Sequence, residues 1–107
     1  MTEEFKNKAL KKSKTTAGIP DSVTVYDERI SDLIDDAVIE MRTGGVPQSV
    51  IDEGAAPVIS CIAHYVCYEL RGDTGETKDA DWHLRKFERK VFRLSLEKEG
   101  ATMEGLL

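Results

Sequence analysis

AAPVISCIAHYVCYEL, residues 55–70, decides the fold of this chain because nearly every residue in it is apolar. Wound as an α-helix at about 100° per residue, the stretch carries apolar side chains around most of its circumference. The widened apolar face consists of Ala55, Val58, Ile59, Ile62, Ala63, Tyr65, Val66, Cys67 and Leu70. Pro57 fits the first turn, where its missing N–H has no partner within the helix. Such a helix must be surrounded, so we predict the central helix of a small bundle.

The same stretch does not have the character of a membrane span. A helix that crosses a bilayer needs roughly 17–25 mostly apolar residues, and this stretch carries His64 and Glu69. The N-terminal sequence MTEEFKNKALKKSK lacks the apolar middle region that export requires, and the chain has two cysteines. We therefore expect no membrane contact and a reducing compartment.

Length and charge limit the class of protein. A chain of 107 residues is expected to form one domain with a single modest core. Charged residues make up 33% of the chain and the formal net charge is −5. This balance argues against a general nucleic-acid binder, because such proteins usually have a basic excess.

A second amphipathic helix is predicted upstream of the central one. Thr24 is expected to be its N-cap, with Asp27 three residues later resembling a capping box. Gly44 and Gly45 are expected to end it with a left-handed C-cap. Its apolar positions follow helical spacing over four turns and are Tyr26, Ile30, Leu33, Ile34, Ala37, Val38 and Met41. Residues 46–54 are expected to be a connection that leads into the central helix.

The last helix is predicted over residues 80–97, after a polar loop over residues 72–79 (GDTGETKD). This loop is expected to be exposed, and either mobile or ordered only by a partner. An inward stripe is formed by Ala80, Leu84, Phe87, Val91 and Leu94. A second stripe is formed by Trp82, Arg85, Arg89, Phe92 and Leu96. Two interpretations stay open for it. Either Phe92 and Leu96 widen the core face while Trp82 covers a helix end, or the stripe is a protein–protein interface, which typically selects aromatic residues and arginine.

We predict an all-α fold, a small bundle of three main helices plus a short N-terminal helix, packed around the central apolar helix. The N-terminal residues 1–14 form either a frayed helix or mobile arm, or an ordered helix docked on a neighbour. The chain is divided into residues 1–22 as an N-terminal arm or short helix and loop, 23–99 as the helical domain, and 100–107 as a flexible tail without helical period.

Catalytic and metal-binding patterns are weak in this sequence. Cys61 and Cys67 diverge by about 120° around the central helix, so with His64 they do not converge on one metal ion, and buried core thiols are expected instead. The acidic residues Glu28, Asp32, Asp35 and Asp36 are expected on a solvated helix face. No phosphate-binding loop or nucleophile elbow occurs, and His83 has no identifiable partner. We expect no enzyme activity, no metal and no cofactor.

Charge is separated between two of the predicted helices. The second helix carries the acidic residues Asp27, Glu28, Asp32, Asp35, Asp36 and Glu40. The last helix carries the basic residues Arg85, Lys86, Arg89, Lys90 and Arg93. Opposite charges can pair within a monomer or between copies, and a head-to-tail contact that closes gives a ring.

The runs RISDLIDDAVIEMRTGGVP (residues 29–47) and PVISCIAHYVCYEL (57–70) resemble the connector proteins that join head to tail in long-tailed bacteriophages. In that family a helix of the form LIxxA, ending in Gly-Val, precedes a loop and an apolar helix. FERKVFRLSL (87–96) approximately matches the family's last helix. The resemblance covers about residues 26–96 and consists of core positions and a glycine turn, without a catalytic signature.

This resemblance implies a non-enzymatic virion protein, assembled in the bacterial cytoplasm. Head–tail connectors, also called adaptors or head-completion proteins, form a ring of about a dozen subunits below the portal, and genomic DNA passes through without sequence-specific binding. Ring contacts are assigned to Glu28, Asp32, Asp35, Asp36, Trp82, Arg85, Arg89, Phe92 and Arg93. Docking to the portal and to the next tail or head-completion protein is assigned to Gly72, Asp73, Gly75, Met103, Leu106 and Leu107.

Two other classes remain as alternatives. A small helical DNA-binding regulator would insert Arg85, Arg89 and Arg93 of the last helix into a groove. The loop over residues 72–79 is long for a helix-turn-helix, and the net charge is unfavourable. An enzyme with an unrecognised site is the other class, although no polar groups converge on a pocket in the pattern.

Overall fold

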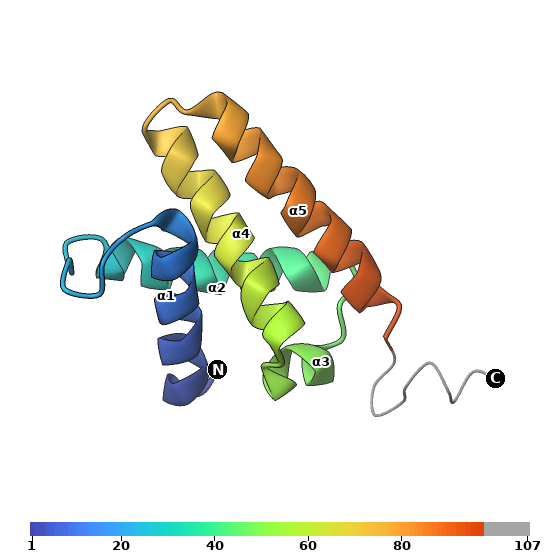
Figure 1. Ribbon diagram of the computed structural model, residues 1–107. Coiled ribbons are helices and arrows are strands. Elements are labelled where there is room, and N and C mark those ends of the chain that lie inside the picture. Colours follow the sequence, from blue (N-terminus) through green and yellow to red (C-terminus); the bar gives the residue numbers. More distant parts are fainter. Residues whose placement is uncertain (98–107) are drawn as a thin grey trace.

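The computed structural model describes residues 1–97, and in this range every regular element is a helix (Figure 1). The five helices are α1 (Glu3–Ala17), α2 (Asp27–Thr43), α3 (Gln48–Glu53), α4 (Ala56–Asp73) and α5 (Thr77–Ser95). The predicted all-α class is therefore confirmed for the described chain. The predicted tail, residues 100–107, lies outside the described residues.

Helix α4 forms where the apolar stretch predicted a helix. It begins at Ala56 with a proline in its first turn and runs to Asp73. α4 packs against α1, α2 and α5; in Figure 1 it passes in front of α2, with α1 and α5 on either side. Its buried residues are Val58, Ile59, Cys61, Ile62, Ala63, Val66 and Cys67. No helix of residues 1–97 is long and apolar enough to span a bilayer.

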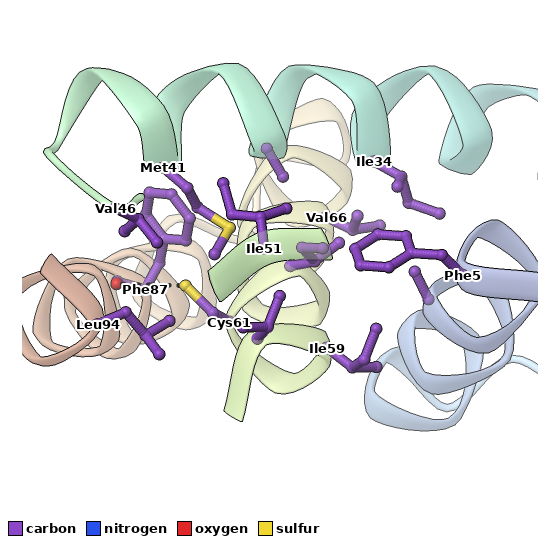
Figure 2. Packing of buried hydrophobic residues seen from close by; sticks show 14 of the residues in the cluster. Phe5, Ile34, Met41, Val46, Ile51, Ile59, Cys61, Val66, Phe87 and Leu94 are labelled. Carbon is purple, nitrogen blue, oxygen red and sulfur yellow. Dashed lines mark hydrogen bonds between the residues drawn. The ribbon is translucent and has the colours of Figure 1, made fainter. Parts of the chain in front are cut away.

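One core joins side chains from all five helices. Figure 2 shows Phe5 of α1, Met41 of α2 and Ile51 of α3 directed toward the side chains of α4 and α5. Phe87 and Leu94 of α5 are buried there too (Figure 2). Leu84 and Val91 of the same helix are partly buried and pack against this core. The predicted inward stripe of the last helix is thus confirmed.

The start of α2 differs from the prediction. Its N-cap residue is Tyr26, with no side-chain capping bond, and Thr24 lies outside the helix. The Thr24 carbonyl accepts a hydrogen bond from the Asp27 N–H (3.1 Å), as in a turn. The Asp27 carboxylate instead lies 2.9 Å from Nζ of Lys14 on α1. A charge partner from another helix therefore replaces the local capping bond.

The end of α2 is a Schellman motif. Of the two glycines here, Gly45 has the left-handed conformation (φ 96°), whereas the C-cap Gly44 has φ −78°. The Gly45 N–H donates to the Arg42 carbonyl and the Val46 N–H to the Met41 carbonyl, both at 3.0 Å. The predicted left-handed C-cap is confirmed, and Gly45 is the residue that has the left-handed conformation.

The connection predicted over residues 46–54 contains a helix. This helix, α3, buries Val50 and Ile51. It ends at Gly54, whose φ is 62°, and a Cβ added there would lie 3.1 Å from Cδ2 of Phe5. Gly54 therefore reverses the chain close to the ring of Phe5, in a conformation that favours glycine. The glycine and proline in this connection flank a short helix and do not mark a loop.

The N-terminal segment is the ordered, docked alternative. Thr2 caps α1 by accepting a hydrogen bond from the Phe5 N–H (3.1 Å), and Gly18 ends the helix in the left-handed conformation. Phe5 and Ala9 are buried in the core. Burial of these two positions holds in place a helix whose other faces are rich in lysine.

The connection between α4 and α5 is shorter than predicted. Gly72 and Asp73 still belong to α4, and α5 begins at Thr77, so only residues 74–76 connect them. The predicted exposure of this segment is confirmed. The two helices run side by side in opposite directions as a helical hairpin (Figure 1). A connection of this length is compatible with a helix-turn-helix, contrary to the prediction of a longer loop. An antiparallel hairpin nevertheless differs from the roughly 90–120° crossing of that motif.

Candidate protein–protein interface

The outward side of α5 presents large apolar side chains beside arginines. Trp82, Phe92 and Leu96 are 52%, 66% and 52% exposed. This α5 outer stripe, defined as Trp82, Arg85, Arg89, Phe92, Arg93 and Leu96, lies opposite the buried residues of the same helix. Phe92 and Leu96 do not widen the core, so that interpretation of the stripe is wrong. Within residues 1–97 none of the three arginines is in an ion pair.

Trp82 packs on histidines and does not cover a bare helix end. Its indole is edge-on to the rings of His83 and His64, with centroids 4.9 and 5.7 Å apart. Nζ of Lys86 lies 5.2 Å from the indole centroid, in position for a cation–π contact. These contacts position a half-exposed tryptophan at the edge of the α5 outer stripe.

The acidic side of α2 is exposed, as predicted, but one of its members is already paired. Asp35 lies 2.9 Å from Nζ of Lys6 on α1. Glu28, Asp32 and Asp36 follow at intervals of four residues, and in the described part of the chain they make no ion pair. We call these three residues the α2 acidic stripe. Ile39, 61% exposed, lies on the same outward side of α2.

The predicted docking residues of the α4–α5 connection are exposed at one end of the hairpin. Gly72 and Asp73 close α4, and Gly75 is in the turn with φ 79°. The Asp73 carboxylate lies 3.2 Å from the Arg29 guanidinium and so links this end to α2. Met103, Leu106 and Leu107 lie outside the described residues.

His83, which had no identifiable partner in the sequence, lies against His64. Their Nδ1 atoms are 3.0 Å apart, one on α5 and the other on α4. Burial, the neighbouring His83 and three lysines lower the pKa of His64 to about 4. Burial and Arg71 also lower the pKa of His83, against an opposing effect of Asp79. Both imidazoles are therefore neutral near pH 7, and one Nδ1–H donates to the other Nδ1. The sequence would have indicated this pairing only if the turn between the two helices had been predicted at residues 74–76, because an antiparallel hairpin with that turn brings His64 and His83 together.

The cysteines are core residues, as expected. Burial raises the pKa of Cys61 to about 12 and that of Cys67 to about 11, which leaves both as unreactive thiols. Sγ of Cys61 lies 3.9 Å from the carbonyl oxygen of Phe87 (Figure 2). Residues 1–97 contain no group of three or more histidine, cysteine or acidic side chains arranged to hold a metal ion.

A groove between α1 and α4 was not predicted. It encloses about 570 Å³ and is lined by Lys8, Lys11, Lys12, Thr15, Ala56, Ile59 and Ser60. Lys8 also donates from Nζ to the Gly54 carbonyl at 3.4 Å. The lysines were visible in the sequence, but the groove exists only because α1 docks beside α4.

Comparison with protein-family models, curated proteins and solved structures finds no match to this chain.

Proposed function

We propose that this chain is a head–tail connector subunit of a long-tailed bacteriophage, an adaptor that forms a ring of about a dozen copies below the portal. The proposal rests on the resemblance of residues 26–96 to that family and assigns the chain no catalytic role. α4 would be the central helix of the subunit, which its packing against α1, α2 and α5 supports.

The observation that carries the proposal is a pair of exposed surfaces with opposite charge, neither of which makes an ion pair within residues 1–97. The α5 outer stripe combines three arginines with exposed Trp82 and Phe92, which suits a protein contact more than solvent. The α2 acidic stripe lies on a different helix and makes no ion pair in the described part of the chain. Surfaces that differ in sign and lie on different helices favour a head-to-tail contact, the kind that closes into a ring.

In this contact, apolar groups would supply most of the affinity. The charges would determine how the two surfaces align with each other. Exposed ion pairs are screened by salt and contribute at most about 1 kcal/mol each. Burying Phe92 and Trp82 would contribute more, because aromatic residues are frequent hot spots. The exposed end of the hairpin at Gly72, Asp73 and Gly75 would remain free for the portal or the next tail or head-completion protein.

Virion localisation and passage of genomic DNA belong to the same proposal. The formal net charge of −5 suits a channel, because a lumen that bound phosphates tightly would slow DNA passage.

Negative-stain electron microscopy tests the proposal directly. The purified chain, alone and mixed with its portal protein, is expected to form closed rings, with the mixture showing a ring on one face of the portal. A chain that stays monomeric even in the presence of the portal would overturn the connector proposal.

A second candidate is a small DNA-binding regulator. It is favoured by Arg85, Arg89 and Arg93, which are exposed on one side of α5, and by the short α4–α5 connection. Its weakness is the antiparallel packing of that connection's two helices. A gel shift with duplex DNA at moderate salt separates the two functions, since a connector should give no discrete complex.

A further inference from the structure

Two lysines of α1 pair with carboxylates of α2 inside the molecule, whereas the other lysines of α1 make no ion pair within residues 1–97. Lys6 contacts Asp35 and Lys14 contacts Asp27, each at 2.9 Å. Lys11 and Lys12 are exposed and make no ion pair within residues 1–97. Helices α1 and α2 therefore carry opposite charges, and only some of these charges form ion pairs within one molecule.

Three lysines of α1 that make no ion pair in the described chain lie toward α4 and not toward α2. Lys8, Lys11 and Lys12 line the groove whose α4 side is formed by Ala56, Ile59 and Ser60. The basic character continues across α4 onto α5. Lys12 of α1 and Lys86 and Lys90 of α5 all lie close enough to His64 of α4 to lower its pKa. The groove thus has an apolar floor and lies at the edge of a basic side of the molecule.

The α2 acidic stripe has the complementary chemistry. Its three carboxylates are spaced at one helical turn, and Ile39 stands beside them, exposed. The stripe lies on the side of α2 opposite the buried residues Ile30, Ile34 and Met41. Within one molecule it consequently faces away from the core and cannot reach the groove between α1 and α4.

We propose that the groove between α1 and α4 receives the α2 acidic stripe of a second copy of this chain. Lys11 and Lys12 would pair with the carboxylates, and Ile39 would pack on the apolar floor beside Ala56. This inference rests on the proposed ring and deepens it, because it adds α1 to the basic half of the contact between neighbours. A nucleic-acid backbone in the groove is the competing occupant.

Charge reversal followed by mixing tests the pairing. In sedimentation velocity at low salt, Lys12→Glu and Asp32→Lys should each weaken self-association by roughly tenfold or more. An equimolar mixture of the two variants should associate again, because each then offers a surface complementary to the other. Lys78→Glu, the same chemical change at an exposed position near the start of α5, should associate like the wild type.

The outcomes separate this inference from the connector proposal. If Lys12→Glu associates normally while reversal of Arg85 and Arg89 prevents association, the ring proposal stands and the groove is excluded from it. If both single variants dissociate and their mixture does not recover, the groove does not face the stripe and the inference is wrong. The inference is also wrong if the wild-type chain is monomeric at millimolar concentration. It is likewise wrong if the only effect of Lys12→Glu is a loss of binding to duplex DNA. Circular dichroism of each variant must match the wild type.

Discussion

The Nδ1 atoms of His64 and His83 lie 3.0 Å apart and join α4 to α5 beneath the edge of Trp82. Such a contact between two imidazoles needs a proton on one nitrogen and a lone pair on the other. It tolerates two neutral rings and is lost when both rings are charged. Lys12, Lys86, Lys90 and Arg71 surround the pair and disfavour additional positive charge, while Asp79 alone favours it.

We predict that stability falls as the pH falls from about 6.5 toward 4. The pKa of His64 is lowered from 6.5 to about 4 in the folded chain, so the unfolded chain takes up its proton first on acidification. Because His64 is partly exposed, solvent screening reduces the contribution to roughly 1 kcal/mol. Urea unfolding at pH 7 and pH 5 measures it. His64→Gln should flatten this part of the pH dependence, and an unchanged slope in that variant would contradict the assignment.

Gly44 is predicted to tolerate no side chain. A Cβ added there would clash with Cγ1 of Val91 on α5. Gly44→Ala should therefore destabilise the fold by about 1–3 kcal/mol. Gly72→Ala is the matched control, because nothing lies within 4 Å of its added Cβ and its place near the end of α4 favours alanine. Thermal unfolding should show Gly44→Ala melting lower than the wild type and Gly72→Ala melting at least as high.

Ile62 is predicted to be essential for folding. Its side chain is 0% exposed on α4, so Ile62→Asp would place an unpaired charge in the core at a cost of several kcal/mol. That cost is comparable to the whole stability of a small domain, and the variant should be unfolded by circular dichroism. Ile39→Asp makes the same chemical change at a position 61% exposed and should remain folded. Equal melting of the two variants would show that α4 is not in the core.

Reversal of charge on the α5 outer stripe is predicted to weaken self-association without affecting helicity. Arg85 and Arg89 are exposed and unpaired in the described chain, so Arg85→Glu with Arg89→Glu removes no ion pair within residues 1–97. Opposite the acidic side of a neighbour's α2, the new carboxylates would repel. Native mass spectrometry should show a smaller oligomer with unchanged circular dichroism, and an unchanged oligomer would exclude this stripe from the interface.

At the candidate interface, the exposure of side chains could be predicted from the helical period. The outward positions of α5 and the acidic side of α2 are exposed as predicted, because each helix buries one stripe and leaves the opposite one in solvent. Asp35 was predicted to contact a neighbouring subunit, but its carboxylate pairs with Lys6 of the same chain. The spacing of apolar residues along one helix carries no information about an ion pair with another helix.

By itself, the sequence determined the all-helical class, the helix within residues 56–73, the inward stripe of α5 and the burial of Cys61 and Cys67, all of which follow from the spacing of apolar residues along one helix. Only the tertiary structure decided that α1 is docked, that residues 48–53 are helical, that His64 meets His83 and that lysines of α1 line a groove on α4. The physical reason is that periodicity reports which side of a helix is apolar, whereas the partner it packs against depends on the positions of all the other helices in the core.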